Sequence, residues 1–257
     1  MVPFAGWDMP VQYTGIIDET KAVRGHAGLF DVSHMGRFKI DGQGAAQALD
    51  RVLSFDVPGL KSGRAKYGVI CDADGGIIDD TILYRQGEES FLLVPNASNA
   101  DAVEAWMRRW ISGPVGIEVV TDALAMIACQ GPEARGIVQG LSEDDLGAVR
   151  PFRFAEAEVA GVSSQAARTG YTGEDGFELM VPSESAAKVW AALVSGGAAP
   201  CGLGARDVLR LEAGLLLHGN DMDPSVNPYE AGLERFSDPD RDGYVAGDAL
   251  RMIRDRG

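Results

Sequence analysis

The segment from Tyr67 to Asn99 limits the fold of this chain more than any other part of the sequence. Three runs rich in β-branched, aliphatic and aromatic residues follow one another there, at Tyr67–Cys71, Ile77–Arg85 and Phe91–Pro95. The two spacers between these runs are rich in Gly, Asp and Ser, which favour turns. We therefore predict three consecutive strands joined by short turns, which is a β-meander.

The middle run places two adjacent aspartates on opposite faces, because successive side chains of a strand alternate. Asp79 shares its face with Thr81, and we expect it to be solvated. Asp80 shares its face with Ile78 and Ile82, where a carboxylate is unfavourable unless it is paired or used. Two interpretations follow: either the register differs and both aspartates are solvated, or Asp80 points into a functional site.

Composition narrows the class of protein. The 257 residues, 46% apolar and 24% charged, suffice for one large or two small domains. A net charge of −15 argues against binding to nucleic acid or to an anionic membrane surface, both of which attract clustered Lys and Arg. A small anionic ligand remains compatible, since one or two local arginines suffice to bind it.

Neither a disulfide framework nor a metal site is indicated. Cys71, Cys129 and Cys201 are scattered and odd in number, which favours a reducing compartment. His34 is either a base, a ligand or a structural residue, and the other two histidines show no ligand spacing with it. Because the sequence has no apolar run of ~18 residues and no signal peptide, we expect a cytoplasmic protein.

A second notable segment runs from Arg168 to Glu178. Three glycines at intervals of three indicate a tightly bent loop between strands. Tyr171 offers a stacking surface, and three carboxylates offer acceptors: Glu174, Asp175 and Glu178. This combination suits a flat ring with N–H donors, whereas phosphate would be repelled. The alternative is an acidic surface loop without function.

A predicted helix begins within Gly202–Asp207, and Arg206 lies in its first turn. The positive end of the helix dipole there reinforces the attraction of Arg206 for an anion. The alternative is an ion pair with Glu178 or Asp207. A further helix is predicted at Asn99–Ile111, where four large apolar side chains at helical spacing indicate core packing: Val103, Trp106, Met107 and Trp110.

Five segments together resemble one family. They are Phe4-Ala5-Gly6-Trp7, Gly28–Gly36, Gly75–Asp80, Arg168–Glu178 and Gly202–Asp207. In this order they are similar to the T-protein of the glycine cleavage system, the folate-dependent aminomethyltransferase, and the similarity spans nearly the whole chain.

The resemblance implies an α+β fold, the folate-binding aminomethyltransferase fold. Two intertwined lobes of antiparallel sheets flanked by helices surround the folate, and a barrel-like third lobe follows. Here residues 1–40 and 122–224 would form the first lobe, and 41–121 the second lobe with the Gly75–Tyr84 hairpin. Residues 225–257 would connect to the third lobe, so the resemblance predicts a truncated form that lacks this C-terminal lobe.

The resemblance also implies an enzyme. The lipoyl arm of H-protein presents an aminomethyl group, and the T-protein transfers the one-carbon unit to tetrahydrofolate and releases ammonia. The expected partners are lipoylated H-protein and folate, with no nucleic acid and no membrane. Tetrahydrofolate is a co-substrate, and no metal is expected.

Residue roles follow from the matching motifs. By resemblance Asp80 is the catalytic aspartate, and Glu178 is the carboxylate that binds the pterin. Four further folate-contacting positions are Tyr67, Asn96, Tyr171 and Arg206, with Met35 as an additional contact. Arg206 would meet either the pterin carbonyl or a folate carboxylate.

Two other functions fit a related fold. One is a folate-binding domain related to dimethylglycine and sarcosine dehydrogenases, but those carry a flavin domain, and this sequence has no dinucleotide-binding glycine motif. The other is a non-catalytic folate-binding protein. One such relative assists iron–sulfur assembly and carries a Lys-Gly-Cys motif, and the corresponding region here, Arg241–Gly247, has no cysteine.

Overall fold

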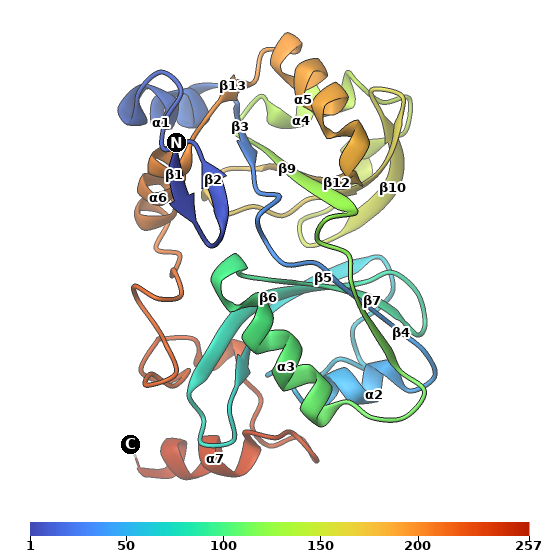
Figure 1. Ribbon diagram of the computed structural model, residues 1–257, viewed down its shortest axis with the longest axis vertical. Helices are drawn as coiled ribbons and strands as arrows, with labels where there is room; N and C mark the ends of the chain where they lie inside the picture. The colour runs from blue at the N-terminus through green and yellow to red at the C-terminus, as the bar shows by residue number, and fades with distance from the viewer. Residues whose placement is uncertain (257) are drawn as a thin grey trace. The chain divides into compact units, whose positions relative to one another are not determined.

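The predicted β-meander forms three adjacent strands of one sheet, β5 (Arg64–Cys71), β6 (Ile77–Arg85) and β7 (Ser90–Pro95). The computed structural model describes residues 1–256 of the chain (Figure 1). β6 pairs antiparallel with β5 on one side and with β7 on the other, with Val69 opposite Asp80. The meander and the α+β fold class are therefore confirmed.

The chain divides into two units, and each unit is built from two separate stretches. Unit 1 consists of Met1–His34 and Thr121–Leu215, and unit 2 consists of Met35–Val120 and Leu216–Gly257. The resemblance predicts that the chain passes from the first lobe to the second after residue 40, returns to the first lobe at residue 122, and forms a connection at residues 225–257. In the structure the chain makes the first two of these passages after His34 and Val120, and the C-terminal stretch packs within unit 2.

Unit 1 contains a six-stranded sheet in the order β10-β11-β12-β9-β3-β13. Its neighbouring strands are antiparallel except for β13 and β3, which are parallel. The strands are β3 (Gly28–Asp31), β9 (Leu124–Gln130), β10 (Phe154–Val159), β11 (Val162–Ala167), β12 (Gly176–Pro182) and β13 (Ala199–Pro200). A separate hairpin at the N-terminus pairs β1 (Val2–Phe4) with β2 (Trp7–Met9).

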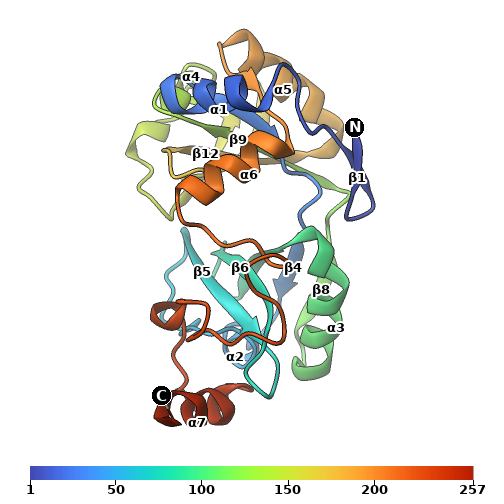
Figure 2. The same cartoon turned by 90° about the vertical axis from the view of Figure 1, so that its left-hand side faces the viewer.

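The helices of unit 1 lie in two groups. Two of them, α4 (Ala134–Gln139) and α5 (Ala186–Ser195), contact β9 and help to cover an apolar core (Figure 1). The other two, α1 (Ile16–Gly25) and α6 (Leu203–Glu212), contact each other (Figure 2). Short 3-10 turns also occur, η2 (Leu146–Ala148) and η3 (Ser183–Ser185) in unit 1 and η1 (Ala97–Asn99) in unit 2.

Unit 2 contains a five-stranded antiparallel sheet in the order β5-β6-β7-β4-β8, with β4 (Phe38–Asp41) and β8 (Gly116–Val119). A core of buried side chains joins this sheet to α2 (Ala45–Asp50) and α3 (Ala100–Trp110). Val103 and Met107 of α3 are buried, and Trp106 and Trp110 pack against the same core. The predicted helix and its apolar stripe are therefore confirmed.

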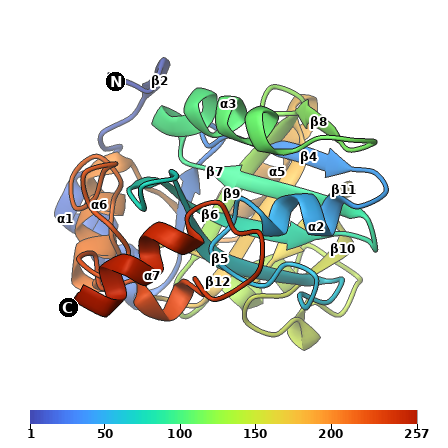
Figure 3. The same ribbon diagram turned by 90° about the horizontal axis from the view of Figure 1, so that it is seen from below.

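A second cluster of unit 2 involves the C-terminal stretch. The short turn η4 (Glu234–Phe236) and α7 (Gly247–Arg256) follow α6, and α7 lies near β5 and β6 (Figure 3). Val69 and Ile77 from the meander are buried together with Tyr244 and Leu250. Arg241 anchors this stretch to α2, because its guanidinium contacts Asp50 Oδ1 at 2.5 Å. Within residues 1–256, no helix has the length and apolar character that crossing a membrane requires.

The packing of α7 predicts a stability difference between two neighbouring residues. Leu250→Ala should lower the free energy of unfolding by about 2–5 kcal/mol, because Leu250 is fully buried and its truncation leaves a cavity. Met252→Ala on the same helix is the control and should change it by no more than about 0.5 kcal/mol, since Met252 is 54% exposed. Urea denaturation measures both values. Equal stability of the two variants would show that α7 is not part of this core.

Candidate functional site

Asp80 lies at the centre of a polar cluster in unit 2. Tyr67 on β5 is opposite Ile82 and is therefore a diagonal neighbour of Asp80 on the same face of the sheet. The Tyr67 hydroxyl donates to Asp80 Oδ2 at 3.1 Å, and the Asn96 amide donates to Asp80 Oδ1 at 2.8 Å. The structure thus brings together three of the predicted site residues, with Asp80 half-buried.

Asp79 is not solvated, and that expectation is wrong. Its side chain is fully buried, on the face of β6 that carries Thr81 and Leu83 toward the core with α3. Asp79 Oδ2 accepts from the Asn96 backbone N–H at 2.9 Å. Asp79 Oδ1 accepts from the side-chain amides of Asn96 at 2.9 Å and Asn99 at 2.6 Å. The sequence indicates the alternation correctly but not which face is enclosed.

Both carboxyl groups have perturbed proton affinities. Burial raises the pKa of Asp79 to about 8, and the neighbouring charge of Asp80 adds to this effect. Burial also raises the pKa of Asp80, while the hydrogen bonds from Tyr67 and Asn96 oppose the rise, as does the charge of His218. His218 also lies within hydrogen-bonding distance of the Ile77 carbonyl, with Nε2 at 3.0 Å.

A second polar cluster, in unit 1, surrounds Glu178 on β12. Glu178 is 5% exposed, and its carboxylate accepts a short hydrogen bond from the Thr169 hydroxyl. Gln130, at the end of β9, is fully buried beneath the loop and donates to the Thr169 carbonyl at 3.0 Å. Gln130 Oε1 also accepts from the Thr172 hydroxyl at 3.2 Å. Gln130 thereby fixes the loop on which the partner of Glu178 is carried.

Arg206 and Tyr171 form the other part of this cluster. The Arg206 guanidinium lies over the Tyr171 ring, 4.6 Å from its centroid. Burial lowers the pKa of Arg206, and the negative charge of Glu178 opposes this effect. Asp207, one of the two expected ion-pair partners of Arg206, instead accepts from Arg210 Nε at 2.8 Å. Unit 1 therefore brings together the predicted residues Glu178, Tyr171 and Arg206.

The other carboxylates of the loop are already engaged. Glu174 forms an ion pair with Arg24 at 3.0 Å, and Asp175 forms one with Arg168 at 2.6 Å. Arg24 also donates to the Thr172 carbonyl at 2.7 Å, so that it holds the loop to α1. Glu178 differs from these two in that it accepts from a neutral hydroxyl, that of Thr169.

Two further candidate site residues, His34 and Met35, lie where the chain first passes from unit 1 to unit 2. Met35 is half-buried, and its carbonyl accepts from Arg37 at 2.6 Å. His34 is buried and meets the Phe4 ring edge-on, with centroids 5.4 Å apart. The contact with Phe4 is one of packing and assigns no chemistry to His34.

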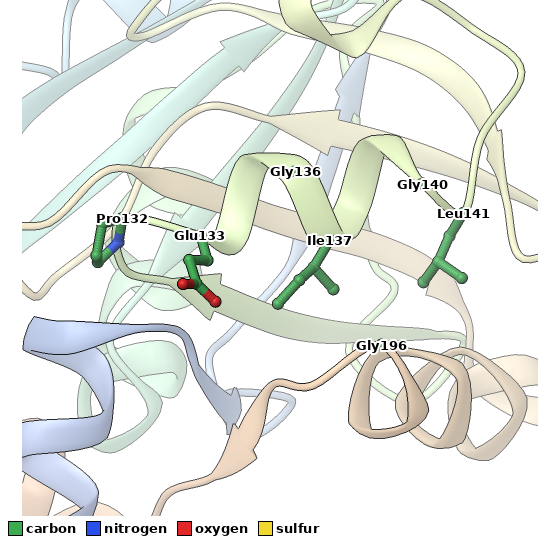
Figure 4. A pocket seen from close by; sticks show the side chains of 7 residues that line it. All are labelled: Pro132, Glu133, Gly136, Ile137, Gly140, Leu141 and Gly196. Atoms are coloured by element: carbon green, nitrogen blue, oxygen red, sulfur yellow. The ribbon is translucent and has the colours of Figure 1, made fainter.

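Unit 1 also has a hollow on its surface. It is lined by α4 and by the end of α5 (Figure 4). Its lining residues are Pro132, Glu133, Gly136, Ile137, Gly140, Leu141 and Gly196. None of them is a candidate from the sequence, and Glu133 is the only ionisable side chain among them.

Sequence reasoning missed four residues of the two clusters: Asp79, Asn99, Gln130 and Thr169. The loop glycines gave the one available signal. A Cβ at Gly170 would lie 1.9 Å from Gln130 Oε1, so a larger residue at position 170 would have to displace this buried side chain. The glycines of the loop therefore indicate that it packs closely on another part of the chain. They do not identify Gln130 as the residue beneath it.

Comparisons with known proteins agree on one family. The family model described as the GCVT N-terminal domain matches residues 1–241. An aminomethyltransferase from Exiguobacterium sibiricum is 44% identical over 257 residues, which cover 100% of this chain and 71% of the relative. One from Geobacillus kaustophilus is 47% identical over 237 residues, which cover 90% of this chain and 65% of the relative. The chain thus spans about two thirds of the length of these relatives.

Solved structures give the same result. The crystal structure of glycine cleavage system aminomethyltransferase T from Bartonella henselae matches with a TM-score of 0.93 and 33% identity, over 100% of this chain and 71% of that one. A heterotetrameric sarcosine oxidase from Corynebacterium sp. U-96 matches with a TM-score of 0.52 and 14% identity, over 70% of this chain and 90% of that one. The second match shows a shared fold alone.

The raised pKa of Asp79 predicts a stability that depends on pH. The folded state keeps the Asp79 proton to a higher pH than the unfolded state does, so this contribution is complete below about pH 4 and is lost as the pH rises through about 8. The stability of the wild type relative to Asp79→Asn should therefore fall between about pH 5 and pH 8.5.

Urea denaturation at both pH values measures this difference. Asp74→Asn, at an exposed aspartate in the turn before β6, is the control and should show no such trend. A difference between the wild type and Asp79→Asn that stays constant with pH would show that Asp79 does not titrate in this range.

Proposed function

This chain belongs to the family of the GCVT N-terminal domain, that of the glycine cleavage T-protein, and we propose that it is the tetrahydrofolate-binding part of an aminomethyltransferase. The donor is the aminomethyl group on the lipoyl arm of H-protein. The methylene carbon leaves the lipoyl sulfur and the amino nitrogen, and it forms two bonds to folate nitrogens. The products are methylene-tetrahydrofolate, ammonia and the dihydrolipoyl thiol.

The observation that carries this proposal is the environment of Asp80. Its carboxylate is half-buried, its pKa is raised, and two neutral donors fix its orientation. A fixed carboxylate stabilises positive charge as it develops on the one-carbon unit, and it orients the nitrogen nucleophile of the folate. The raised pKa also makes this carboxylate a stronger base than a solvated aspartate.

The cluster of unit 1 supplies the recognition of the pterin. Glu178 accepts two bonds from the pterin, one from its amino group and one from a ring N–H, which is a charge-assisted pairing. Tyr171 offers a face for stacking, and Arg206 binds an oxygen of the folate. Tyr67 and Asn96 both hold Asp80 and contact the folate, and Met35 adds an apolar contact.

Asp80→Asn tests the catalytic role. In the full protein this change should reduce the rate of aminomethyl transfer from lipoyl-loaded H-protein by about 10²-fold or more, because an amide is neither a base nor a negative charge. Binding of tetrahydrofolate should change much less, since the amide keeps the shape and part of the hydrogen bonding. Asp74→Asn serves as the matched control, and a normal rate in Asp80→Asn would exclude Asp80 as the catalytic residue.

Glu178→Gln tests pterin recognition. Calorimetry should show tetrahydrofolate binding weakened by about 1.5–3 kcal/mol, the typical contribution of a hydrogen bond to a charged group. Glu158→Gln is the control, because Glu158 is exposed on β10 in the same sheet. If both variants bind tetrahydrofolate as the wild type does, Glu178 is not in the site.

A further inference from the structure

A second carboxylate lies directly behind the Asn96 amide that contacts Asp80. Asn96 Nδ2 is 2.9 Å from Asp79 Oδ1 and 2.8 Å from Asp80 Oδ1. It also lies 3.1 Å from the Asp80 carbonyl oxygen. One amide nitrogen therefore joins two carboxylates that point to opposite faces of β6.

The position of this amide depends on Asp79. A side-chain amide has two N–H hydrogens in one plane, so giving one to each carboxylate fixes the rotation of the Asn96 side chain. The backbone N–H of Asn96 donates to Asp79 Oδ2 at 2.9 Å, which fixes the main chain at the same residue. Asn99 donates to Asp79 Oδ1 at 2.6 Å and thereby holds Asp79 itself.

The alternative orientation of the amide is unfavourable for a physical reason. Rotating the Asn96 amide by half a turn would turn its oxygen toward Asp79 Oδ1 and Asp80 Oδ1, and Asp79 Oδ1, which accepts from both Asn96 and Asn99, has no proton to donate to that oxygen. With an apolar residue at position 79, only Asp80 would oppose this rotation. Asp79 therefore selects the orientation in which Asn96 donates to Asp80.

We propose that Asp79 is a positioning residue for the transfer reaction and acts through Asn96 to hold the Asp80 carboxylate in its reactive orientation. This inference rests on the proposed function of Asp80. A role in folding alone would be met better by an apolar side chain, since a buried carboxylate beside a second carboxylate is unfavourable by its charge. The raised pKa of Asp79 is the physical consequence of that arrangement.

A double-mutant cycle in the full protein tests the coupling. Asp79→Asn should lower kcat for aminomethyl transfer by about 10-fold or more, with KM for tetrahydrofolate nearly unchanged, because misplacing a reactive group reduces the rate rather than the affinity. In an Asn96→Ala background the same change should cost less than about 2-fold, since the residue through which Asp79 acts has been removed. If Asp79→Asn lowers kcat by the same factor in the wild-type and Asn96→Ala backgrounds, the proposal is overturned.

Thr81→Val is the matched control. Thr81 is buried on the same strand and the same face, and its hydroxyl donates to the Val94 carbonyl at 2.8 Å rather than to Asn96. This variant should lose stability but keep kcat. If Thr81→Val lowers kcat as much as Asp79→Asn does, the effect is a general response to damage in β6 and the proposal is wrong.

Two further variants, Asp80→Asn and Asn99→Ala, distinguish a failure of the proposed function from a failure of the positioning role. If Asp80→Asn transfers at the normal rate, the proposed function of this cluster fails. If Asp80→Asn is impaired and Asp79→Asn is normal, only the positioning role fails. Should Asp79→Asn not fold, Asn99→Ala removes one donor to Asp79 without touching Asn96. It should reduce kcat severalfold in the wild-type background and have no effect in Asn96→Ala, and an unchanged kcat in both backgrounds would overturn the proposal.

Discussion

The two-sided pairing of β6 is the constraint on which unit 2 depends. β5 pairs with β6 through both aspartates, and β7 pairs with it from Thr81 to Arg85, so the backbone of β6 is held and each of its side chains is assigned to one face. One face packs toward α3, and the other meets Tyr67. Two adjacent aspartates in such a strand are therefore separated permanently. The same constraint makes one of them a buried group and leaves the other accessible.

A buried carboxylate requires compensation, and this structure provides it with amides. Asp79 receives three N–H groups, all from the segment that follows β7. Hydrogen bonds from neutral donors reduce the penalty of burial without adding a positive charge that would neutralise Asp80. A buried arginine at this place would stabilise Asp79 more strongly, but it would also compete for the charge of Asp80. Because the donors to Asp79 are neutral amides, they leave the negative charge of the accessible Asp80 carboxylate in place.

The sequence predicts the strands of unit 2 better than it predicts the surroundings of the two aspartates. The meander followed from turn residues and strand-forming runs, which are local properties. The burial of Asp79 could not follow from the same pattern, because period-2 alternation states that two residues face apart and does not state which face is enclosed. That answer depends on α3 and on Asn96 and Asn99, which approach Asp79 from 17 and 20 residues away. Gln130 likewise reaches Thr169 across 39 residues, and nothing local marks it.

The acidic residues of the two units differ in the groups that donate hydrogen bonds to them. Glu174 and Asp175 face arginines at 3.0 and 2.6 Å, and such pairs use most of the capacity of a carboxylate to bind anything else. Asp80 accepts from a tyrosine hydroxyl and an amide, and Glu178 accepts from a threonine hydroxyl, so that neutral donors orient these oxygens. An oriented carboxylate with its charge retained attracts a ligand that carries N–H groups or developing positive charge. The sequence alone does not distinguish these four acidic residues from one another. The hydrogen-bond donors that contact them in the structure do.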